Sequence, residues 1–279
     1  MMRDIFTILY ITLHEAGRRR VLTATLIGAA AFLLLYGIGF HLVAHKVVSD
    51  GGLTVVRQRL FLNFLTLAGL YVSHFLALMT AVLLPVDTLS GDIASGVVQT
   101  VTTKPVRRSS IVLGKWLAFV LVAIAYYMVV SLGVLAIGLV LGHFTPPGLA
   151  IALPLMALEA VVFVSISIAG GARLATVTNG VLVFALYGLA FIGSWVEQIG
   201  TMAGNANARY VGTVASLIMP TEALYQRAAY FMQPSMMRDL HMTPFATASL
   251  PSEAMVWWAV GYAVAAVWLG VHAFGKRAL

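Results

Sequence analysis

Residues 116–142 read WLAFVLVAIAYYMVVSLGVLAIGLVLG, a run of 27 residues without a charged side chain. A helix rises about 1.5 Å per residue, so about 20 apolar residues cross the roughly 30 Å hydrocarbon core of a bilayer. In lipid the backbone N–H and C=O groups must be bonded within the protein, and the run lacks the polar alternation of a barrel strand. The run therefore predicts a transmembrane helix with length to spare for tilt.

Five other stretches have the same character. The whole chain agrees with them, since 61% of its 279 residues are hydrophobic and 10% are charged, against about a quarter charged in soluble proteins. The predicted spans are residues 21–43, 60–86, 111–142, 149–172, 178–196 and 254–275. We expect an all-α polytopic membrane protein with a six-span domain in residues 21–279, preceded by an interfacial segment in residues 1–20.

The lysines and arginines predict the orientation. Six spans place both termini on one side, and eleven of the 17 lysines and arginines fall on that side of the predicted topology. Because Lys and Arg accumulate in cytoplasmic loops, we expect both termini to be cytoplasmic, in an inner or plasma membrane. The net charge of +7 is then mostly a topology signal, and no nucleic-acid partner is expected. The absence of cysteine excludes disulfides and thiolate metal sites.

The predicted cytoplasmic loop, residues 87–110, reads DTLSGDIASGVVQTVTTKPVRRSS, and IVLGK follows it at residues 111–115. Gly96 is suited to end or begin a helix, and Pro105 disfavours helix at Lys104. These features predict a short element that projects between two long helices.

On these residues the chain resembles the permease subunits of ABC-2 type ABC transporters. Within them it is most similar to the branch associated with multicopper-enzyme maturation. Asp92 and Gly96 stand where the family usually has Glu-x-x-x-Gly, and the departures are Asp for Glu and Val97 for Thr. The resemblance implies that this coupling loop docks on a cytoplasmic ATP-binding subunit. The implied contacts are Asp92, Gly96, Gln99, Lys104, Pro105, Arg107 and Arg108.

A plainer interpretation of the basic residues in this loop is that they set topology and contact anionic headgroups. Two other segments are also similar to the family. Residues 3–20 resemble its N-terminal elbow helix, with Phe6, Leu9 and Leu13 on one face, as an interfacial helix requires. The MPTEAL segment at Met219–Leu224 resembles an element before its last span.

No ATPase motif is present in the chain. A phosphate-binding loop ends in Gly-Lys-Ser/Thr, and neither Gly-Lys pair in the chain has these flanks. We therefore expect no enzyme activity and no cofactor in this chain, with ATP and Mg handled by the partner. The resemblance also implies a homodimer or pairing with a second permease, because six spans are half of such an exporter core.

Glu159 is the acid inside the fourth predicted span, close to mid-depth. An ionised carboxylate there costs several kcal/mol unless it is paired, protonated or hydrated. Glu159 is therefore the candidate for a substrate-pathway residue, and the alternative is a structural acid bonded to a neighbouring helix. His74 is expected to be a hydrogen-bonded packing residue. No Ser, His and acid are spaced as a nucleophile with its base, so no catalytic site is expected.

The predicted external loop, residues 197–253, holds six of the ten methionines that follow Met1 and Met2. Thioether and imidazole ligands suit Cu(I), which makes Met237, His241 and Met242 a candidate metal site. The alternative is an amphipathic, half-buried helix in which methionine serves as adaptable packing.

The function expected from these observations is that of a transmembrane permease subunit of an ABC-type exporter. It would move an unidentified substrate with ATP hydrolysed by a separate subunit. The alternative is a non-transporting membrane protein, either an assembly scaffold or a copper-handling subunit.

Overall fold

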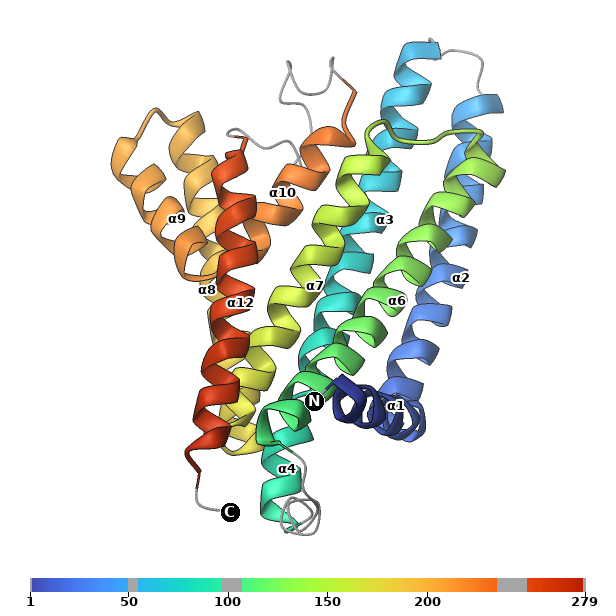
Figure 1. Ribbon diagram of the computed structural model, residues 1–279. Helices are drawn as coiled ribbons and strands as arrows, with labels where there is room; N and C mark the ends of the chain where they lie inside the picture. The colour runs from blue at the N-terminus through green and yellow to red at the C-terminus, as the bar shows by residue number, and fades with distance from the viewer. Residues whose placement is uncertain (1, 50–54, 97–106, 235–249, 278–279) are drawn as a thin grey trace.

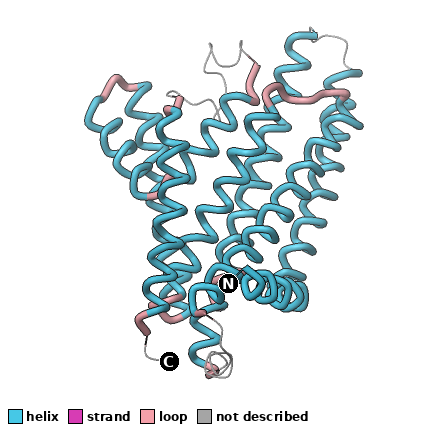
Figure 2. Tube along the Cα trace, viewed as in Figure 1, coloured by secondary structure: helices cyan, strands magenta, loops and turns pink. Residues whose placement is uncertain are grey.

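The computed structural model describes residues 2–49, 55–96, 107–234 and 250–277 (Figure 1). These residues are almost entirely helical, with short loops at the two ends of a bundle and no strand in the described ranges (Figure 2). The helices are α1 (Met2–Arg18), α2 (Arg20–Ser49), α3 (Val55–Leu83), α4 (Thr88–Ala94), α6 (Arg108–Gly142), α7 (Leu149–Gly171), α8 (Thr176–Met202), α9 (Ala206–Ile218), α10 (Thr221–Phe231) and α12 (Glu253–Gly275).

Six helices in the described ranges are long and apolar enough to cross a membrane: α2, α3, α6, α7, α8 and α12. This confirms the predicted all-α fold with six spans. Several boundaries differ from the prediction, and two of these differences have a clear physical reason. α3 ends at Leu83 because Pro85 disfavours helix at the residue before it. α8 continues to Met202, past Glu197, because the carboxylate-bearing turn packs against Gly212 of α9.

The centre of the bundle is formed by α3, α6 and α7, which lie side by side in Figure 1 with α2 on one flank and α12 on the other. Leu67 of α3, Phe119 of α6 and Phe163 of α7 are among the largest fully buried side chains. α2 buries few residues and presents most of its apolar surface outward. The helices that flank the central three therefore pack against the core on one side and expose apolar side chains on the other.

α1 lies across the bundle and packs against α6 (Figure 1). The close approach needs Gly114, where an added Cβ would lie 2.8 Å from the Cβ of Ile8. The predicted apolar face is divided: Leu9 and Leu13 are half-buried, whereas Phe6 is 60% exposed. Since α1 turns one side to the protein, the other apolar side remains for a membrane interface.

In the described part of the segment expected as an external loop, residues 197–253, lie the helices α9 and α10. α9 folds back along α8, and a Cβ on Gly193 of α8 would overlap the Cβ of Ala215. α10 packs against α7, α8 and α12, and buries Leu224 and Met232. Met219 and Met232 are fully buried, as the packing alternative expects, whereas Met202 is 77% exposed. That the segment is external stays a prediction.

The termini lie near α4 at one end of the bundle, as an even number of spans requires (Figure 1). We call this the α4 end. That it faces the cytoplasm stays a prediction, based on the distribution of lysine and arginine.

Candidate functional site

The α4 end contains most of the residues that the sequence selected for partner binding. α4 begins after Asp87, and its first turn is buried. It ends at Ala94, and Gly96 follows the C-cap Ser95 with φ +73°, a left-handed conformation that favours glycine. The N–H of Gly96 donates to the C=O of Ile93 at 3.3 Å. The expectation that Gly96 ends a helix is therefore met. Ala94 and Ser95, at the end of this short helix, are exposed.

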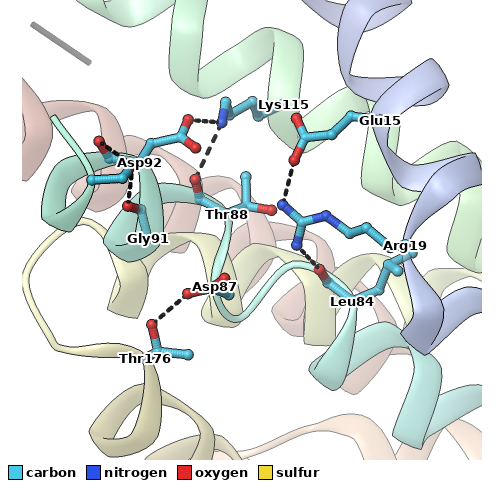
Figure 3. Close-up of polar contacts among 10 residues, drawn as sticks. Glu15, Arg19, Leu84, Asp87, Thr88, Gly91, Asp92, Lys115 and Thr176 are labelled. Carbon is cyan, nitrogen blue, oxygen red and sulfur yellow. Dashed lines mark hydrogen bonds and ion pairs between the residues drawn. The ribbon is translucent and has the colours of Figure 1, made fainter. Parts of the chain in front are cut away.

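Lys115 of α6 fastens α4 to the bundle (Figure 3). Its ammonium group forms an ion pair with the carboxylate of Asp92 and donates to the C=O of Thr88 at 3.2 Å. The side chain of Lys115 is 8% exposed and that of Asp92 is 24% exposed. Asp92 therefore faces its own bundle, although the resemblance implied a contact with the partner.

A second attachment joins α4 to α8. The hydroxyl of Thr176 donates to Oδ1 of Asp87 at 2.7 Å (Figure 3). It also lies 2.8 Å from the hydroxyl of Ser90. Gly91 makes this arrangement possible, because a Cβ there would lie 2.6 Å from Oδ1 of Asp87. The first turn of α4 is thus held to the first turn of α8.

Asn179 joins the α3–α4 turn to the end of α7. Its side-chain amide donates to the C=O of Ser167 at 2.8 Å and to the C=O of Val86 at 3.3 Å. A Cβ on Gly170 would overlap the side-chain oxygen of Asn179, so α7 needs glycine at this position. The α3–α4 turn and the helices α7 and α8 consequently meet at one buried amide.

Arg19, between α1 and α2, completes the attachment on the opposite side of α4. It donates to the C=O of Leu84 at 3.2 Å and to Glu15 at 2.6 Å, and its guanidinium group lies 5.8 Å from the ring centroid of Phe119 (Figure 3). The end of α3 is therefore held by the junction of the elbow helix with the first span.

The remaining predicted partner contacts divide into three groups. Arg108 donates to the C=O of Gly275 at 3.1 Å and of Arg277 at 2.7 Å, so it holds the end of α12. Arg107, the N-cap of α6, is exposed. Gln99, Lys104 and Pro105 lie outside the described residues, and their role stays a prediction.

Sequence reasoning missed Lys115 and Thr176 as functional residues. Lys115 was counted as a topology charge, although it is the last charge before a 27-residue uncharged run. A lysine at that depth needs a counter-ion, and this was the available signal. Thr176 left no signal, because its partner Asp87 is 89 residues away in the chain.

Glu159 and His74 lie together inside the bundle, away from the α4 end. Oε2 of Glu159 is 2.9 Å from Nδ1 of His74, and the same nitrogen is 3.3 Å from the hydroxyl of Tyr127. All three side chains are buried. The candidate pathway acid is thus beside the histidine that was expected to be a packing residue.

The candidate Cu(I) ligands, Met237, His241 and Met242, lie outside the described residues, so this site stays a prediction. Within the described ranges, no group of three or more His, Asp or Glu side chains is placed to hold a metal ion.

Comparison with known families gives one match, and the matched residues include both α4 and Glu159. A search of curated proteins finds no match. The model of the ABC-2 family transporter proteins matches residues 56–225, more than half of the chain, from α3 through α4 to the middle of α10. The chain therefore belongs to the ABC-2 transporter family and is a multi-pass membrane component of an ABC transporter.

Proposed function

We propose that this chain is the permease subunit of an ABC exporter and that α4 is where a separate ATP-hydrolysing subunit docks. The observation that carries the proposal is the shape of the α4 end. A short helix with an exposed tip, Ala94 and Ser95, is fastened by side chains to α6 and α8. Such an element transmits force, because a load on its tip reaches two different spans.

The attachments suggest how ATP would drive transport. Closure of the ATPase subunits moves α4, the Asp92–Lys115 ion pair carries this motion to α6, and the Asp87–Thr176 hydrogen bond carries it to α8. The bundle then alternates access between the two sides of the membrane. In this account Asp92 and Arg108 are positioning residues, since both bind groups of their own chain.

Three finer assignments belong to this proposal. The resemblance of residues 87–115 supports the branch associated with multicopper-enzyme maturation, and the family supports pairing of two six-span units. Glu159 is placed on the substrate pathway because it is a buried acid in a transmembrane helix.

The test is recovery of an ATPase from membranes of cells that express the tagged full-length chain. The variant Ala94→Glu with Ser95→Glu changes only exposed positions, so the bundle should fold. The matched control, Ala206→Glu with Asn207→Glu, places the same charges on exposed positions of α9.

We expect wild type and control to bring down a protein with a Gly-Lys-Ser/Thr phosphate-binding loop, identified by mass spectrometry, together with ATP hydrolysis. The amount of ATPase recovered with the α4 variant should fall at least about tenfold. This is expected when like-charge repulsion and lost contacts weaken the binding free energy by about 1.4 kcal/mol or more. Equal recovery with the α4 variant, or loss with the α9 control alone, would contradict docking at α4.

A further inference from the structure

Five buried polar side chains meet beneath α10, and we call them the buried acidic cluster: His74 of α3, Tyr127 of α6, Glu159 of α7, and Glu222 and Tyr225 of α10. None of them is more than 4% exposed. Four helices contribute, so the cluster lies where the central spans meet α10. The sequence counted Glu222 among the external acids, and the structure instead places it inside the protein.

α10 is held firmly in this position. The side-chain amide of Asn63 on α3 donates to the C=O of Met232 at 3.0 Å, and Gln226 donates to the hydroxyl of Ser194 on α8. Arg227 donates to the C=O of Pro251 and approaches Glu253 at 3.4 Å. The Glu222 carboxylate is therefore brought to the cluster by a fixed helix.

The cluster leaves hydrogen-bonding capacity unused. Among the described residues, no hydrogen-bond partner exists for Nε2 of His74, Oε1 of Glu159, Oε2 of Glu222 or the hydroxyl of Tyr225. The other carboxylate oxygen of Glu159, Oε2, lies 2.9 Å from Nδ1 of His74, within ion-pair distance. Buried polar atoms are nearly always bonded in proteins, and each unpaired one costs about 1–3 kcal/mol. So many unpaired polar atoms in one buried place indicate a site that is completed by a ligand.

The charge of the cluster indicates the sign of that ligand. Two carboxylates face one histidine, and in the described part of the chain the charges acting on Glu222 come from His74 and Glu159. With neutral His74 the cluster has a formal charge of −2, and with protonated His74 it has −1. Either state calls for a positive partner, because isolated carboxylates in a low-dielectric interior are strongly unfavourable.

Aromatic rings gather around His74, the histidine paired with Glu159, and indicate an organic cation. The centroid of Tyr225 lies 4.3 Å from that of His74 and 5.4 Å from that of Tyr71. The centroid of Tyr127 lies 6.4 Å from that of His74. Tyrosine faces attract ammonium groups, whereas inorganic cations need several oxygen ligands.

Glu222 is the member of the cluster whose charge responds to pH near neutrality. It lies in the first turn of α10, where the helix dipole favours an anion. Its pKa is raised to about 7, chiefly by burial, with His74 lowering it and Glu159 raising it. A cation that enters the cluster near pH 7 therefore competes with a proton.

We propose that the buried acidic cluster is a subsite for the cationic group of the transported substrate, a substituted ammonium held between Glu159 and Glu222 with tyrosine faces around it. This inference rests on the proposed function, because it treats the cluster as part of the transport pathway. In this account alternating access opens the cluster to one side of the membrane.

The test uses tetraethylammonium, a permanent cation, and the purified full-length chain in detergent. Equilibrium dialysis of the radiolabelled probe at pH 8.5 should show saturable binding of about one cation per chain. Glu159→Gln and Glu222→Gln should each weaken binding at least tenfold, and the double variant should abolish it. Glu253→Gln, on an exposed acid near α10, should bind within about twofold of wild type.

The pH dependence adds an independent check. At pH 5.5 the wild type should bind more weakly, because Glu222, whose pKa is raised to about 7, is then mostly protonated. The other titratable groups that face Glu222 are Glu159, His74, Tyr71, Tyr127, Tyr187 and Tyr225. The double variant should show no such change.

No saturable binding to the folded wild type, unchanged binding in the double variant, or full competition by equimolar sodium would each overturn the subsite. The ATPase recovery experiment at α4 does not depend on these residues. If cation binding fails while ATPase recovery is intact, the subsite is wrong and the permease assignment stands. If ATPase recovery fails while cation binding is intact, the docking at α4 is wrong and the subsite stands.

Discussion

The α4 end and the buried acidic cluster both place charged side chains among packed helices, yet they treat them in opposite ways. At the α4 end Lys115 has Asp92, and Arg19 has Glu15 and a backbone carbonyl. In the cluster, Glu159 and Glu222 have unpaired oxygens. Paired charges fasten helices to one another, whereas unpaired ones lower stability unless a ligand binds. Substitutions in the two regions should therefore change stability with opposite signs.

Glu222→Gln gives the largest expected effect. The folded chain holds the Glu222 proton up to a pKa of about 7, while an unfolded chain releases it near 4.5. Stability therefore falls as the pH rises from about 4.5 to 7, and the loss is complete above 7. At pH 8 the variant should be more stable than wild type by about 3 kcal/mol.

Thermal unfolding of the purified chain in detergent at pH 4.5 and pH 8 measures this effect. The two proteins should differ little at pH 4.5 and most at pH 8. Glu253→Gln should follow wild type at both values. A Glu222→Gln variant that is less stable than wild type at pH 8 would show that the acid is already paired in the unloaded protein.

Lys115→Met should have the second largest effect, with the opposite sign. It leaves Asp92 without its cation and Thr88 without a donor, and we expect a loss of about 2 kcal/mol, because the carboxylate is only partly buried. Adding Asp92→Asn should recover part of the loss, since the two residues form one interaction. Strictly additive losses in thermal unfolding would mean that the ion pair does not hold α4.

Gly170→Ala should destabilise the chain by about 1–2 kcal/mol. The new Cβ displaces the Asn179 side chain, which then loses its bonds to Val86 and Ser167. Gly188→Ala, where a Cβ meets open space in α8, should be neutral or slightly stabilising. Equal unfolding temperatures for the two variants would contradict the role of Asn179.

Arg108→Ala should have the smallest effect, below about 1 kcal/mol, because its hydrogen bonds are partly exposed. The change should be local to the end of α12. Hydrogen exchange should become faster at residues 270–276 and stay unchanged in α2, whereas Arg20→Ala should leave residues 270–276 unaffected. Uniformly faster exchange across the bundle would assign Arg108 a global role instead.

The sequence predicted the six spans because long uncharged runs have few alternatives in lipid. It did not resolve α9 and α10, because these helices carry charges such as Arg209 and Glu222 within short amphipathic runs. Their depth depends on partners such as Asn63 and Ser194, which are distant in sequence. Hydropathy describes one residue at a time and contains no information on such pairs.

The candidate sites show the same limit. Asp92 was found through a motif, and its position near the projecting loop was predicted, but its partner Lys115 requires knowing how α4 folds against α6. Glu159 was found because an acid in a span is conspicuous. Glu222 was assigned to the outside, since only packing shows that α10 buries it.

The central claim is that the exposed tip of α4 contacts an ATPase subunit. Because the chain has no cysteine, Ala94→Cys gives a single attachment point for a photoactivatable maleimide in native membranes. The claim predicts a cross-linked product that contains the ATPase subunit, and no such product from Ala206→Cys on α9. A product from Ala206→Cys with none from Ala94→Cys would contradict it.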